Sequence, residues 1–145
     1  MQTWLPHNSF TKSARLLDYR RLGKQRVECK QILEALRRNG GAWYNHPATQ
    51  MWKNYEPALC LYALLVCEEW VRRGYRDTLT AYFESQYSQD ELIDTPLPPW
   101  HGDDRIHSSH RGRLLMKAPE FYSQYGWTDA PVEKTLYERD LRLMI

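Results

Sequence analysis

Hydrophobic and charged positions between residues 11 and 38 recur with the period of an α-helix. The apolar side chains fall on one stripe, and charged side chains fill most of the other positions. We predict a first helix that begins near Thr11 or Ser13 and ends at Arg38, because the Asn-Gly-Gly sequence at 39–41 suits the left-handed conformation that closes many helices. The apolar stripe consists of Leu22, Cys29, Ile32, Leu33 and Leu36.

Two further long helices are predicted in the rest of the chain. Residues 56–73 are apolar almost all round, which is typical of a central, buried helix, and Pro57 and Gly74 suit its two ends. A third helix is predicted to begin at 104 or 106 and to end at 117. The connecting segments are predicted to be an aromatic loop or short helix at 42–55, a short helix within 77–89, and an acidic, proline-rich loop at 90–104.

These elements predict an all-α fold, a compact bundle of three main helices with long connecting loops. No segment shows the apolar–polar alternation of a β-strand. The 145 residues fit one domain. We assign residues 1–127 to that domain and residues 128–145 to a C-terminal tail, which we expect to be helical over the segment VEKTLYERDLRLM.

The composition is that of a globular protein in water, with 42% hydrophobic and 26% charged residues. No apolar run reaches the roughly 20 residues that span a bilayer, so no membrane association is expected. The N-terminal sequence MQTWLPHNSF lacks the layout of a signal peptide, and we expect a cytoplasmic monomer, either nucleoid-associated or phage-encoded. The three cysteines show no metal-binding spacing; we expect reduced, buried thiols, no metal and no cofactor.

The net charge of +2 hides an uneven distribution. Residues 11–38 carry nine Lys or Arg and three acids, and residues 105–117 carry four basic side chains, two histidines and no acid. Residues 84–104, between these two segments, carry six acids and no Lys or Arg. This arrangement favours one face that binds a polyanion and another that repels it. Ordinary solvated charge is the alternative.

One acid stands within the basic part of the first helix, in the sequence RLGKQRVECKQ at 21–31. At about 100° per residue, Arg21, Lys24 and Glu28 share one flank of the apolar stripe, at the border between core and solvent. Such a glutamate can serve as a general acid or base, or as the partner of a developing cation. The alternative is a surface ion pair, which contributes little stability.

Three other segments offer side chains for a nucleic acid. In the Asn45-His46-Pro47 turn, His46 can cap a helix or contact a phosphate or base. In HSSHRGRLLMK at 107–117, the cationic residues favour phosphate contacts over a metal site, since no carboxylate lies close by. In EFYSQYGW at 120–127, Tyr122 and Tyr125 either stack on bases or pack on the core.

Several segments of the chain, taken in order, carry a likeness to a known protein family. They are LLDYRRLGKQRVE at 16–28 with NHP at 45–47, LLVCEEWVRRGYRDT at 64–78, and PEFYSQYG at 119–126. In this order and spacing the chain resembles the pyrimidine-dimer DNA glycosylases of the phage endonuclease V type. The likeness covers most of residues 1–126. It implies an all-α, three-helix fold without a metal, and base excision at a damaged pyrimidine.

The resemblance also implies a mechanism and site residues. The terminal amine attacks C1′ of the damaged nucleotide to form an imine, a glutamate on the first helix assists, and β-elimination can then cut the strand. Glu28 matches that glutamate. The large Gln2 should resist removal of Met1, which would leave the amine of Met1 as the nucleophile. The nucleic-acid contacts implied here are Gln2, Thr3, Arg21, Lys24, Arg26, Asn45, His46, His110, Arg111, Lys117, Tyr122 and Tyr125.

The function predicted on these grounds is a DNA N-glycosylase that excises damaged or modified pyrimidines from duplex DNA, with AP-lyase activity left open. Two alternatives stand beside it. One is a DNA-binding module that keeps the basic face without the chemistry, and the other is a glycosidase that acts on a free nucleoside or nucleotide. Basic residues on two helices favour DNA over a small nucleotide.

Overall fold

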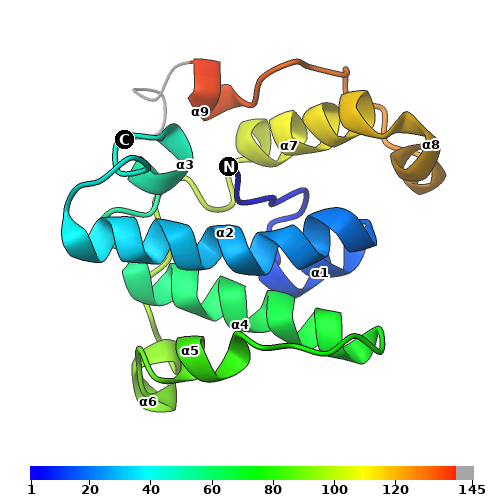
Figure 1. Ribbon diagram of the computed structural model, residues 1–145. Coiled ribbons are helices and arrows are strands. Elements are labelled where there is room, and N and C mark those ends of the chain that lie inside the picture. The colour runs from blue at the N-terminus through cyan, green and yellow to red at the C-terminus, as the bar shows by residue number, and fades with distance from the viewer. Residues whose placement is uncertain (140–145) are drawn as a thin grey trace.

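The computed structural model describes residues 1–139, and within them the fold is all-helical with no β-strand. Helix α4 (Glu56–Arg72) lies along α2 (Tyr19–Arg38), and α1 (Phe10–Leu16) packs against α4 beside it (Figure 1). The predicted stripe of α2 is buried, and its side chains meet the apolar side chains of α4 in the core. The expected all-α class and the bounds of α4 are therefore confirmed.

The single first helix that the pattern predicts is in fact two helices, α1 and α2. Leu17 and Asp18 between them are extended, with ψ angles of 140° and 159°. Leu17 is fully buried, so the apolar pattern runs on through the break. The hydroxyl of Tyr122 donates to the Asp18 carboxylate and accepts from the Asp18 amide at 3.1 Å. A contact with a residue this far along the chain leaves no trace in a local pattern.

Helix α7 (Asp104–Lys117) has the predicted bounds and runs above α2 in Figure 1, and α8 (Pro119–Tyr122) and η1 (Ser123–Tyr125) follow it. Helix α5 (Thr80–Glu84) lies within the expected segment. Helix α6 (Gln89–Ile93) extends into the segment 90–104 that was predicted as a loop, and a capping box of Ser88 and Glu91 starts it. The short α3 (Pro47–Gln50) lies beside the N-terminus.

The C-terminal tail packs on α7 rather than extending from it. Only α9 (Leu136–Arg139) is helical among its described residues, and the rest of the predicted tail helix, 140–145, lies outside them. Gly112 permits the close approach, since a Cβ there would lie 2.3 Å from the carbonyl oxygen of Ala130. The Val132 amide donates to the Gly112 carbonyl at 3.2 Å. The division of the chain at residue 127 stays a prediction.

All three cysteines are buried and free, as expected. Burial raises the pKa of Cys60 to about 11 and that of Cys67 to about 12, so both are protonated thiols. Among the described residues no helix is long and apolar enough to cross a membrane. The same residues contain no cluster of His, Cys, Asp or Glu that could hold a metal ion.

Candidate active site

The first five residues thread through the core between α2 and α7 in extended form (Figure 1). A buried extended segment without a strand partner must find other partners for its backbone groups. Gln25 on α2 supplies two of them: its amide group donates to the Gln2 carbonyl at 2.6 Å and accepts from the Trp4 amide at 2.6 Å. The N-terminus is thereby held against α2.

Two histidines of α7 hold the other side of this segment. His110 Nδ1 accepts from the Leu5 amide at 2.8 Å, and His107 Nδ1 lies 2.8 Å from the Leu5 carbonyl oxygen. Since His107 Nε2 accepts from the Gly102 amide, its proton is on Nδ1 and is donated to Leu5. Burial lowers the pKa of His107 and lowers that of His110 to about 3, so both rings are neutral.

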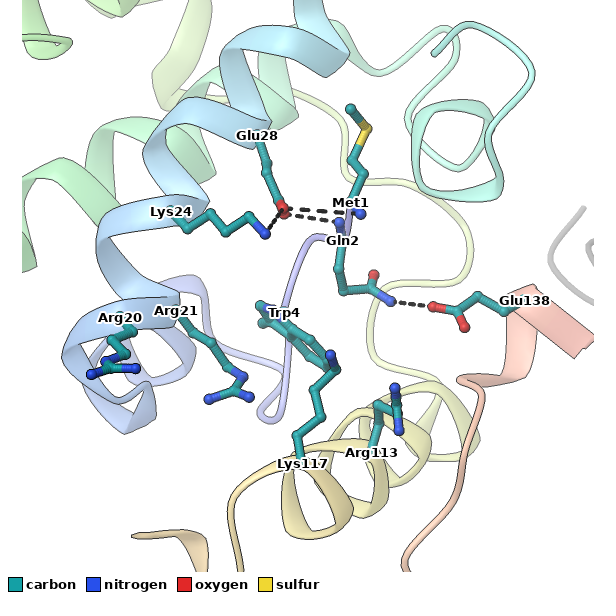
Figure 2. Close-up of a pocket in the computed structure, with 10 residues that line it drawn as sticks. All are labelled: Met1, Gln2, Trp4, Arg20, Arg21, Lys24, Glu28, Arg113, Lys117 and Glu138. Carbon is teal, nitrogen blue, oxygen red and sulfur yellow. Dashed lines mark hydrogen bonds and ion pairs between the residues drawn. The ribbon is translucent and has the colours of Figure 1, made fainter. Parts of the chain in front are cut away.

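The α-amino group of Met1 emerges opposite Glu28 (Figure 2). Its nitrogen lies 4.0 Å from Glu28 Oε1, and the Gln2 amide donates to Glu28 Oε2 at 2.9 Å. Lys24 Nζ lies 3.7 Å from the same carboxylate. The Met1 side chain is only 1% exposed, whereas the residue as a whole is partly exposed. The accessible part of Met1 is therefore its main chain, which carries the amine.

These groups line a cavity of about 330 Å³ between α2 and α7 (Figure 2). Five of its lining side chains are cationic, two are carboxylates, and Trp4 packs among them. Burial, followed by repulsion from neighbouring cations, lowers the pKa of Lys117. A hollow with this excess of positive charge suits a phosphate-bearing ligand. The cations are Arg20, Arg21, Lys24, Arg113 and Lys117.

Six of the residues expected at a site are brought together here. They line one cavity although they come from the N-terminus, from α2 and from α7. Thr3 lies directly beneath them, fully buried, with its hydroxyl accepting from Trp52 Nε1 at 3.0 Å. Thr3 thus supports the N-terminal segment and faces away from solvent. The six are Met1, Gln2, Arg21, Lys24, Glu28 and Lys117.

Arg26 and Arg111, both expected to contact nucleic acid, do not line this cavity, and such a contact stays a prediction. Arg26 forms an ion pair with Asp77 and lies over the ring of Trp70, 4.6 Å from its centre. It stands about 200° around the helix from Lys24, so the period itself directs it to the opposite side. Arg111 donates to Asp129 at 2.9 Å and to the Pro6 carbonyl at 2.9 Å.

Three more candidates serve the packing of the fold. His110 and Tyr122 are fully buried, which conflicts with a contact to nucleic acid. Tyr125 is partly exposed and donates its hydroxyl to the Leu16 carbonyl at 2.9 Å, where α1 ends. The alternative stated for the aromatic segment, packing on the core, is therefore correct for Tyr122.

Asn45 and His46 lie at the edge of the N-terminal region. Asn45 is exposed, and His46 caps α3 by accepting from the Ala48 amide at 3.1 Å. Burial and then the charge of the α-amino group lower the pKa of His46. His46 is thus the expected helix cap; contact of either residue with nucleic acid stays a prediction.

Four lining residues were not among the site residues named from the sequence, although Arg113 lies in the cationic segment 107–117. Arg113 stands one helical turn before Lys117, and Arg20 stands one turn before Lys24, so helical spacing could have indicated both. Trp4 could have been suspected only once the N-terminal segment was known to be buried. Glu138 lies on α9, far along the chain from Glu28, and no local signal places it here.

Comparison with known proteins gives one match. A family model described as pyrimidine dimer DNA glycosylase matches residues 1–83, which include the N-terminal segment, α2 and α4. Comparisons with curated proteins and with solved structures gave no match. The matched part carries Met1 and Glu28, whereas Lys117 and Glu138 lie beyond it.

Proposed function

Since the chain belongs to the pyrimidine dimer DNA glycosylase family, we propose that it excises damaged or modified pyrimidines from duplex DNA at the cavity between α2 and α7. The observation that carries the proposal is the position of the Met1 amine, 4.0 Å from the Glu28 carboxylate within a cationic hollow. A nucleophile, a carboxylate and phosphate-binding side chains then act on one nucleotide.

The reaction begins with attack of the neutral α-amine on C1′ of the damaged nucleotide. The C1′–N bond breaks, and the base leaves with the electron pair and takes up a proton. Loss of the second amine proton, with opening of the sugar ring, then yields an imine. Glu28 stabilises the cationic sugar as the base departs and carries protons between these groups. From the imine, loss of the C2′ proton and departure of the 3′ phosphate cut the strand by β-elimination.

The cations of the cavity bind the DNA backbone. Arg21 and Lys24 on α2 and Arg113 and Lys117 on α7 face one another across the hollow, so a strand held between them is contacted from both sides. The amine reaches a sugar only when the duplex is bent and a nucleotide is turned out, which costs a few kcal/mol and less at a lesion that already disturbs stacking.

The test is an incubation with a labelled duplex that carries one thymine dimer, with and without borohydride. A covalent adduct that maps to the peptide containing Met1, and that is lost in Glu28→Gln, supports the proposal. Glu34→Gln is the matched control, because Glu34 lies on the same helix and pairs with Lys30 at 3.9 Å, away from the cavity. Salt-dependent binding without adduct or cleavage would instead identify a DNA-binding module.

A further inference from the structure

The C-terminal tail contributes a second carboxylate to the cavity, from a part of the chain beyond the family match. Gln2 Nε2 donates to Glu138 Oε1 at 2.8 Å, with the Thr135 hydroxyl at 3.4 Å (Figure 2). On the other side of the same side chain, Gln2 Oε1 accepts from the Thr3 amide at 2.9 Å. The buried amide of Gln2 is thus paired at both of its polar atoms.

The backbone of Gln2 is held as firmly as its side chain. Its N–H donates to Glu28 and its carbonyl accepts from Gln25. With both peptide groups of Gln2 fixed, the α-amino group can move only by rotation within Met1. The buried Met1 side chain, whose sulfur accepts from the Thr49 hydroxyl at 3.8 Å, limits that rotation as well.

The tail is anchored so that Glu138 has a defined place. The Leu136 amide donates to the Ser109 hydroxyl at 3.1 Å, and the Tyr137 ring, buried, packs edge-on against His110. Helix α9 contacts both α3 and α7, which flank the N-terminus (Figure 1). Two of the expected nucleic-acid contacts on α7, His110 and Arg111, therefore lie on the strip where the tail packs.

We infer that Glu138 is a positioning residue of this site: its carboxylate fixes Gln2 and thereby holds the Met1 amine against Glu28. This inference rests on the proposed function for its effect on rate, but its effect on the N-terminal segment is independent of the chemistry. A small displacement of the amine would slow the attack strongly, because a reacting atom about 1 Å out of place can cost on the order of a hundredfold in rate.

Three variants separate positioning from charge. Glu138→Ala removes the acceptor for Gln2, Glu138→Gln keeps an acceptor oxygen without the charge, and Glu133→Ala removes an exposed carboxylate from the same tail. We expect imine trapping on dimer-containing duplex to slow about tenfold or more in Glu138→Ala, with the affinity for DNA changed by no more than about twofold. Glu138→Gln and Glu133→Ala should trap at the wild-type rate.

Hydrogen exchange of the peptide that contains residues 1–5 is the second measurement. Its amides should exchange faster in Glu138→Ala than in wild type, Glu138→Gln or Glu133→Ala. Unchanged exchange in Glu138→Ala would overturn the inference, as would a trapping loss shared by Glu138→Gln, which would indicate a role for the charge. Absence of trapping in the wild type would refute the proposed function alone, and exchange would still decide the role of Glu138.

Discussion

Acid should destabilise this protein at a pH where its carboxylates are still ionised. His110 should cause part of this loss, because the chain takes up about one proton at this residue when it unfolds. The ring is fully buried, accepts from the Leu5 amide through Nδ1 and leaves Nε2 without a partner among the described residues. Burial lowers the pKa of His110 to about 3, against 6.5 for the ordinary side chain. Between these two pKa values the unfolded chain therefore binds a proton at His110 that the folded chain does not bind.

The sign and size of the effect follow from linkage. A group whose pKa is lower in the folded state makes its full contribution to stability when the pH is above the pKa of the unfolded chain. This contribution is lost as the pH falls towards the pKa of the folded state. Below pH 6.5, the effect of His110 should lower the free energy of unfolding by about 1.4 kcal/mol for each unit that the pH falls. At pH 4.5 the loss from this residue alone should reach about 3 kcal/mol.

The assay is urea unfolding of wild type and His110→Asn between pH 7.5 and 4.5. Asparagine places an acceptor oxygen near the position of Nδ1 but does not titrate, so the variant should be less stable at pH 7 and lose stability less steeply below pH 6. His7→Asn is the control, since His7 is partly exposed whereas His110 is fully buried. Equal slopes for wild type and His110→Asn would refute the reasoning.

Other predictions concern the cavity and the packing of the tail. Lys117→Ala should lower the slope of log affinity for DNA against log salt concentration by about one unit. Arg111→Ala should leave this slope unchanged, because Arg111 faces Asp129 outside the cavity. Equal slopes for the two variants would place the DNA elsewhere. Gly112→Ala should lower the unfolding free energy by about 1–3 kcal/mol and speed exchange of residues 130–139, since its Cβ would meet the Ala130 carbonyl; unchanged values would show that the tail is not tightly packed there. Tyr122→Phe should cost about 1–3 kcal/mol by removing the bond to Asp18, which a thermal unfolding midpoint equal to that of wild type would contradict.

The part of the site that helical periodicity alone could predict lies on one helix, whereas Met1, Gln2 and Lys117 were named from the resemblance to a family. Helical period alone places Arg21, Lys24 and Glu28 on one flank of α2, and the structure finds them lining one cavity. The same period, applied strictly, would have placed Arg26 on the opposite side of α2 from Lys24 and so excluded it from the site.

The remainder depends on contacts between distant segments. The burial of the N-terminus, the break at Asp18 and the place of Glu138 are each fixed by residues about 100 or more positions away, such as His110 for Leu5 and Tyr122 for Asp18. Local patterns of hydrophobicity report which face of a helix is buried, but they do not report what buries it. Fold class and the bounds of α4 and α7 were therefore accessible, whereas the break between α1 and α2 and the partners of the polar groups were not.

The threading of residues 1–5 between α2 and α7 has a consequence for synthesis. Residues 1–5 are synthesised before the segments that hold them, because the histidines that hold Leu5 and the carboxylate that holds Gln2 lie about 100 or more residues further along the chain. The contacts of residues 1–5 with α2 lie within the family-matched region, whereas those with α7 and α9 can form only after these later helices are made. A chain that ends before α7 thus lacks the contacts that hold Leu5 and the Gln2 side chain, and on the proposed function its site is complete only after α7 and α9 are made.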